Sequence, residues 1–120
     1  MTYRIAVASS DGKVVNQHFG HCRQFIIFEV SDTGEWSFKE TRNTIPPCST
    51  GEHSFSLLNQ AIKELSDCSF VVVSQIGFGA EQALLQAGIK TYVMPDLIYS
   101  ALNKIVSSLL PEQVKLKINL

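Results

Sequence analysis

The sequence has little of what a membrane protein or a nucleic-acid-binding protein needs. No apolar run approaches the ~20 residues of a membrane-spanning helix. The formal net charge is −1, which argues against a broad nucleic-acid footprint, because such surfaces usually carry a strong basic excess. The amino-terminal residues run directly into a strand pattern, without the apolar segment of a signal peptide. We therefore expect a cytoplasmic protein that binds neither a membrane nor a nucleic acid.

Cysteine is scarce as well. The three cysteines, Cys22, Cys48 and Cys68, have no paired spacing, and a cytoplasmic setting disfavours structural disulfides. Free thiols of this kind are either buried apolar groups or ligands for metals and redox centres. Cys68 lies between Asp67 and an expected apolar strand, which favours a core thiol. Cys48 lies just before an expected helix, where it is either a thiolate stabilised by the helix dipole or a small packed residue.

Convergent catalytic groups are also missing. The first expected strand, residues 3–8, carries no carboxylate, whereas metal-dependent nuclease chemistry needs several carboxylates that converge. His21 and Cys22 could form a thiol–imidazole pair, but neighbours in a chain rarely point at each other. A thiol-dependent enzyme that uses Cys22 is therefore the least favoured function.

What is present is the alternation of an α/β protein. Apolar, β-branched runs predict strands at residues 3–8, 24–30, 36–40, 70–73 and 89–94. Apolar residues at 3.6-residue spacing predict helices at 55–65, 80–87 and 97–109. Strands that alternate with helices indicate parallel pairing with right-handed crossovers. We see no linker or repeat, so we expect one domain over residues 1–120.

Turn residues refine this pattern. Asp32-Thr33-Gly34 predicts a hairpin, after which Trp36, Phe38 and Glu40 alternate along the returning strand. We expect Gly88 to end the second helix. We expect Asp96 to cap the last helix, with Leu97 on the apolar face. The tail from Val114 to Leu120 alternates apolar and polar residues, which favours an edge strand.

The most informative stretch is His18-Phe19-Gly20-His21-Cys22. It places three soft or borderline metal ligands within five residues, and imidazole and thiolate are the usual ligands of zinc and of iron–sulfur centres. A loop with this spacing can turn at least two of them toward one point. Loop histidines that are only solvated or hydrogen-bonded are the alternative.

A second stretch, Gly77-Phe78-Gly79, lies between an expected strand and an expected helix. Backbone amides at such a helix N-terminus can receive an anion. The third glycine of a dinucleotide fingerprint is Gln82 here, so a tight strand-to-helix turn is favoured over nucleotide binding.

Beyond these patterns, the chain resembles the dinitrogenase iron–molybdenum-cofactor-binding family. That family includes nitrogenase accessory carriers and the C-terminal domain of the radical enzyme that makes the cofactor core. The similar segments are Ile5-Ala6-Val7-Ala8, Asp11-Gly12, Val15 to His21, Phe25 to Val30, Cys48 before Gly51, Leu65 to Cys68, Ile76-Gly77 and Ala87-Gly88-Ile89. The run Asn-Gln-His-Phe-Gly-His is the specific part. The resemblance spans about residues 3–108, and residues 111–120 lie outside it.

The resemblance implies a ribonuclease-H-like, three-layer α/β fold, with a mixed sheet of about five strands and helices on both faces. It also implies binding or escort of iron–sulfur-type clusters, including precursors of the iron–molybdenum cofactor, and it does not imply catalysis. A permanently held cubane usually takes four cysteine thiolates, and this chain offers three. We therefore expect a transient guest cluster, exchanged with donor and acceptor proteins by a monomer or weak homodimer.

The leading hypothesis is thus a non-enzymatic metallocluster carrier in nitrogenase cofactor biosynthesis. Its expected iron or sulfide contacts are His18, His21, Cys22 and Cys48, with support from Asn16, Gln17 and the amides of Gly77 and Gly79. The alternative is a small zinc-binding or regulatory interaction module that uses the same four ligands.

Overall fold

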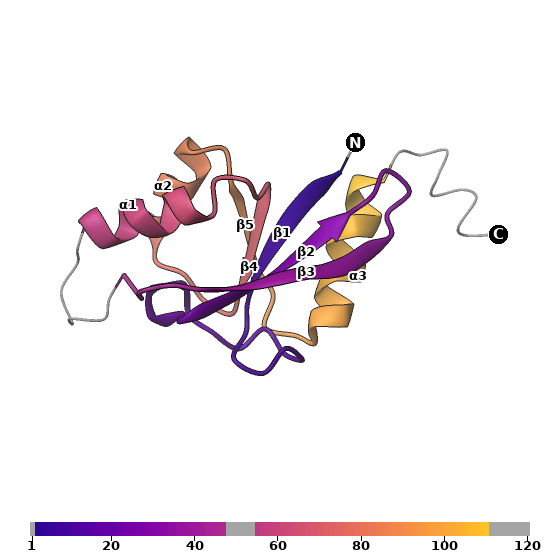
Figure 1. The fold of residues 1–120 in the computed structure, drawn as a ribbon, viewed down its shortest axis with the longest axis horizontal. Coiled ribbons are helices and arrows are strands. Elements are labelled where there is room, and N and C mark those ends of the chain that lie inside the picture. The colour runs from indigo at the N-terminus through magenta and orange to yellow at the C-terminus, as the bar shows by residue number, and fades with distance from the viewer. Residues whose placement is uncertain (1, 48–54, 111–120) are drawn as a thin grey trace.

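The fold is a five-stranded mixed sheet with helices on both faces (Figure 1). The computed structural model describes residues 2–47 and 55–110. Its strands are β1 (Tyr3–Ala8), β2 (Gln24–Val30), β3 (Trp36–Asn43), β4 (Phe70–Val73) and β5 (Lys90–Val93). Its helices are α1 (Phe55–Glu64), α2 (Phe78–Gln86) and α3 (Ile98–Leu109), with a one-turn 3-10 helix, η1, at Phe19–His21.

The strand order β3-β2-β1-β4-β5 joins an antiparallel half to a parallel half. β1 pairs with β2 in antiparallel fashion and with β4 in parallel fashion, and β4 pairs in parallel with β5. The carboxyl ends of β1, β4 and β5 therefore meet at one edge of the sheet, where ligands bind in many α/β proteins. The predicted α/β class and mixed sheet are confirmed, while the finer ribonuclease-H-like assignment stays a prediction.

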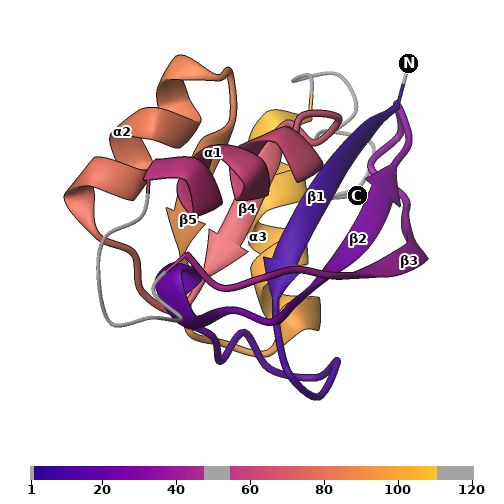
Figure 2. The same cartoon turned by 60° about the vertical axis from the view of Figure 1, so that its left-hand side comes forward.

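Two apolar cores lie on opposite faces of this sheet. α1 and α2 cover one face and α3 covers the other (Figure 2). In β1 the side chains alternate between the cores: Ile5 and Val7 belong to the α3 core, and Ala6 and Ala8 to the α1/α2 core. The α1/α2 core also contains Phe19 of η1. The loop after β1 is therefore fixed to the fold by a buried side chain.

The helix ends follow the predictions only in part. Gly88 ends α2 with φ +85°, and this left-handed conformation is the one that favours glycine after a helix. α3 begins at Ile98 rather than at Leu97, which is 54% exposed. Asp96 Oδ1 accepts a hydrogen bond from the Leu97 amide (2.8 Å), one residue too early for a helix cap. The predictions that Asp96 caps this helix and that Leu97 lies on its apolar face are therefore wrong.

β3 contains a β-bulge that breaks the predicted alternation. Phe28 pairs with Phe38, whereas the preceding Ile27 pairs with Glu40, so Lys39 is the extra residue. Paired residues share a face of the sheet, and Glu40 therefore lies on the face opposite Phe38. A bulge of this kind bends and twists an edge strand.

Some predictions fall outside the described residues. They are the edge strand from Val114 to Leu120 and the placement of Cys48 before the first helix. Within the ranges that the structure describes, no helix is long and apolar enough to cross a membrane.

Candidate functional site

The histidine-containing loop connects β1 to β2 and begins with a turn in which Ser9 is buried and Ser10 to Lys13 are exposed. The Ser9 hydroxyl donates to Asp11 Oδ1 (3.1 Å) and accepts from the Gly12 amide (3.0 Å). The Asp11 carboxylate also accepts from the Lys13 and Val14 amides, and these bonds lower its pKa. Gly12 has φ +76°, so this turn needs a residue that tolerates the left-handed region.

The same loop is joined to the segment after β4 by backbone hydrogen bonds. The Ser74 amide donates to the Gln17 carbonyl (3.0 Å), and the Phe19 amide donates to the Gln75 carbonyl (2.9 Å). These two bonds frame His18, which forms an isolated parallel bridge with Gln75. The backbone on both sides of His18 is therefore fixed at the sheet edge where β1 and β4 end.

η1 sets the direction of the two histidine side chains. Phe19 is 1% exposed, and its ring centroid lies 6.0 Å from that of Phe25. The Gly20 amide donates to His18 Nδ1 (3.0 Å), and the His21 amide donates to the His18 carbonyl (3.0 Å). The phenylalanine thus anchors the turn in the core while the histidines flank it.

The structure brings His18 and His21 together. Their ring centroids lie 5.1 Å apart, with His18 partly buried and His21 exposed. Burial lowers the pKa of His18, and the neighbouring His21 lowers it further. Both effects favour the neutral form of the His18 ring, in which one nitrogen accepts and one donates.

Cys22 does not join this pair. Its side chain is fully buried in the α1/α2 core, and the thiol donates to the Gln24 carbonyl (Sγ to O, 2.8 Å). Burial raises the pKa of the Cys22 thiol to about 11, whereas metal ligation and nucleophilic attack both need a thiolate. Cys22 as a ligand stays a prediction, but this conformation gives it no support.

Cys68 is also a core thiol, as predicted. It is 4% exposed, and burial is the main cause that raises its pKa to about 12. Cys48 lies outside the described residues. Among the residues that the structure does describe, no three His, Cys, Asp or Glu side chains are grouped so that they could hold a metal ion. This part of the chain therefore offers no closed coordination shell for zinc.

Gly77 and Gly79, whose backbone amides are expected to support the site, occupy different positions at the start of α2. Gly77 is the N-cap of α2, and no side chain caps this helix. The first amides of α2 therefore lack an intrahelical acceptor and carry the positive end of the helix dipole. Gly79 is the second residue of α2 rather than part of the turn, and Glu81 is the acidic residue of the first helical turn.

Asn16 and Gln17 mainly hold the loop together. The Asn16 side chain accepts from the Ser10 amide (3.0 Å) and donates to the Ser10 hydroxyl (2.9 Å). Gln17 Nε2 donates to Asn16 Oδ1 across 3.5 Å. The Asn16 side chain therefore stabilises the conformation of the loop. The sequence did not predict that Ser74 and Gln75 are hydrogen-bonded to the histidine-containing loop. These bonds join backbone atoms, so no side-chain pattern signals them.

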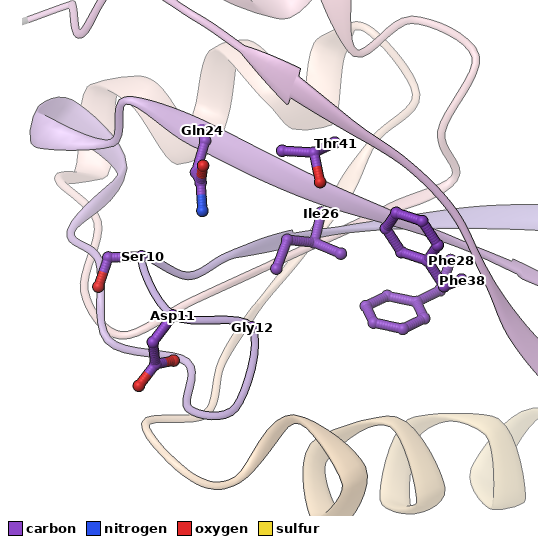
Figure 3. Close-up of a pocket in the computed structure, with 8 residues that line it drawn as sticks. All are labelled: Ser10, Asp11, Gly12, Gln24, Ile26, Phe28, Phe38 and Thr41. Carbon is purple, nitrogen blue, oxygen red and sulfur yellow. The ribbon is translucent and has the colours of Figure 1, made fainter.

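A separate hollow of about 440 Å³ lies on the α3 side of β2 and β3 (Figure 3). Its lining residues are Ser10, Asp11, Gly12, Gln24, Ile26, Phe28, Phe38 and Thr41. The bulge in β3 places Phe38 and Thr41 on this same face of the sheet. Phe19 and Cys22 pack on the other face of the sheet, and the Asp11 carboxylate is bonded to loop amides. The hollow therefore adds no ligating group to the histidine pair.

Comparison with known proteins gives a consistent picture. A family model described as dinitrogenase iron–molybdenum cofactor matches residues 1–108. The FeMo cofactor biosynthesis protein NifB of Frankia alni is 38% identical over 112 residues, which cover 91% of this chain and 22% of that protein. NifB of Azotobacter vinelandii is 38% identical over 90 residues, covering 72% and 18% of the two chains. This chain thus spans about a fifth of the length of these curated relatives.

Solved structures agree on the fold. The crystal structure of PH0822 superposes with a TM-score of 0.60 at 19% identity, covering 90% of this chain and 93% of that chain. A protein of Methanocaldococcus jannaschii described as a candidate dinitrogenase gives a TM-score of 0.58 at 15% identity, covering 92% and 94%. At these identities the likeness concerns the fold alone.

Proposed function

The chain belongs to the dinitrogenase iron–molybdenum cofactor family, and from this premise we propose that it binds and hands on a metallocluster without catalysing a reaction. The guest is an iron–sulfur-type cluster, such as the iron–molybdenum cofactor or one of its precursors. The partners are the protein that supplies the cluster and the protein that receives it.

The observation that carries this proposal is the fixed pair of imidazoles at the carboxyl edge of the parallel strands. His18 and His21 lie 5.1 Å apart by ring centroids, on a turn whose backbone is bonded to the segment after β4. That segment leads within three residues into the uncapped N-terminus of α2. Imidazoles and the positive end of a helix together suit an anionic guest of the size of a cluster.

The residues fit a guest better than a resident cofactor. A stable cubane usually takes four thiolates, yet the two cysteines of the described residues are buried, with raised pKa values. A cluster that arrives with its own ligands needs only to be recognised, and it can leave again. A carrier needs this weak and reversible hold.

The test is an anaerobic titration with isolated iron–molybdenum cofactor, followed by its visible absorption and by bound iron. We expect the wild type to take up about one cluster per chain, and His18→Ala/His21→Ala to lose most of this affinity. Glu35→Ala is the matched control, because Glu35 is exposed near the β2–β3 hairpin, at the other end of the sheet. Equal uptake by the double variant and the control would refute the site.

A further inference from the structure

We propose that His18 recognises its guest by donating a hydrogen bond from Nε2–H, and that it does not ligate iron. This inference rests on the proposed function and specifies how the site works. It commits the guest to one chemical class: a cluster whose metals already have their ligands, and which presents sulfide or carboxylate oxygen atoms as hydrogen-bond acceptors.

A hydrogen bond within η1 fixes which nitrogen of His18 carries the proton. The Gly20 amide donates to His18 Nδ1 across 3.0 Å, so the lone pair of Nδ1 is engaged. A neutral imidazole carries one proton, and here that proton must sit on Nε2. Ligation of iron through Nε2 needs a lone pair on that nitrogen and hence a proton on Nδ1. Two N–H groups would then face each other at Gly20.

Backbone hydrogen bonds and a buried side chain hold the turn that carries the His18 ring. His18 is bracketed by backbone bonds from Ser74 to Gln17 and from Phe19 to Gln75. Phe19 is buried at 1% exposure against the α1/α2 core. A flip of the imidazole would place a carbon atom against the Gly20 amide and lose the bond that caps η1. The donor form is therefore already in place, whereas the ligand form must break local structure.

The groups near His18 also include hydrogen-bond donors. The first amides of α2, after the uncapped Gly77, are also donors. His21 is exposed beside His18. Sulfide and carboxylate guests accept hydrogen bonds, whereas a bare zinc or ferrous ion needs lone pairs and would be repelled by N–H groups. The site thus discriminates between a complete cluster and a bare cation.

Two substitutions separate the functions of the two ring nitrogens. His18→Asn keeps a side-chain oxygen that can accept from the Gly20 amide, since asparagine is a good N-cap, but it has no donor at the position of Nε2. His18→Gln reaches that position with an amide N–H. We expect glutamine to hold the isolated iron–molybdenum cofactor within about threefold of wild type, and asparagine to weaken it about tenfold, as for one lost charge-assisted bond.

The deciding measurement is pulsed electron paramagnetic resonance on protein that contains 15N-histidine and is loaded with the cofactor in a paramagnetic state. We expect a weak 15N coupling, as for a hydrogen-bonded nitrogen. A strong coupling of directly bound imidazole that disappears in His18→Gln would overturn the inference, as would glutamine binding no better than asparagine. In both cases the wild type still takes up cofactor, so the proposed function stands. No uptake by the wild type refutes the proposed function and this inference with it.

Discussion

The sharpest consequence of the structure concerns Cys22, because the sequence makes it a candidate ligand and the structure buries it. Its pKa is raised to about 11 by burial. At pH 7.5 such a thiol is roughly 0.03% thiolate, whereas an ordinary thiol with a pKa of ~8.5 is roughly 10% thiolate. We therefore expect native Cys22 to react with iodoacetamide at least about 300-fold more slowly than the same thiol after unfolding in guanidinium.

The assay can follow each thiol separately. Trypsin cleaves after Lys13, Arg23, Arg42, Lys63 and Lys90, which places the three cysteines in three different peptides. Mass spectrometry of timed samples then gives one labelling rate for Cys22, with the unfolded protein as its own reference.

A second arm uses Cys22→Ser, which keeps a donor toward the Gln24 carbonyl and removes the soft ligand. We expect its uptake of isolated cofactor to stay within about twofold of wild type, because the thiol faces the core. Labelling of native Cys22 at a rate within tenfold of the unfolded rate would refute this reasoning. The reasoning would also be refuted if Cys22→Ser lost cofactor uptake while its midpoint of unfolding by denaturant stayed at the wild-type value.

Three further outcomes test the packing of the site and the stability of the fold around it. Phe19→Ala removes the buried anchor of η1 and should lower the free energy of unfolding by about 3–4 kcal/mol in denaturant titration; a loss below about 1 kcal/mol would contradict this anchor. Gly34→Ala should cost about 1–3 kcal/mol in the same assay, since φ is +85° and the new Cβ would lie 2.8 Å from Leu110 Cδ2; an unchanged midpoint would contradict it. Hydrogen bonds from Arg42 hold the pKa of Asp67 well below its usual range, so the folded state binds fewer protons than the unfolded state. Stability should fall as the pH drops below about 4, less steeply in Asp67→Asn, and equal slopes in thermal melts would contradict this.

The parallel half of the fold could be predicted from the sequence because its signals are local. The run from Phe70 to Val73 is a short β-branched strand, and it is indeed β4, between β1 and β5. Gly88 marks the end of α2 because only glycine adopts φ +85° without strain. Such features depend on the backbone preferences of a few neighbouring residues.

The structure departs from the sequence pattern, or adds to it, where distant segments decide the local structure. The bulge at Lys39 depends on the pairing of β3 with β2, and nothing in β3 itself signals an extra residue. The inward direction of Cys22 depends on the core that α1 and α2 complete. The hydrogen bond from the Ser74 amide to the Gln17 carbonyl joins backbone atoms only, so no side-chain pattern predicts it.

For the candidate site, the spacing of the loop predicts that at least two of His18, His21 and Cys22 can turn toward one point. The structure brings the two histidines together. The protonation of His18 Nε2 depends on the Gly20 amide, which no spacing argument supplies. Under the inference proposed above, the predicted site is a set of hydrogen-bond donors rather than a set of metal ligands.

Native mass spectrometry without oxygen tests the central claim most directly. The protein is mixed with isolated iron–molybdenum cofactor and transferred intact to the gas phase. We predict a one-to-one adduct whose added mass equals that of the whole cluster, present in wild type and Cys22→Ser and strongly reduced in His18→Ala/His21→Ala. An absent adduct, or one that persists undiminished when both histidines are replaced, would contradict the account.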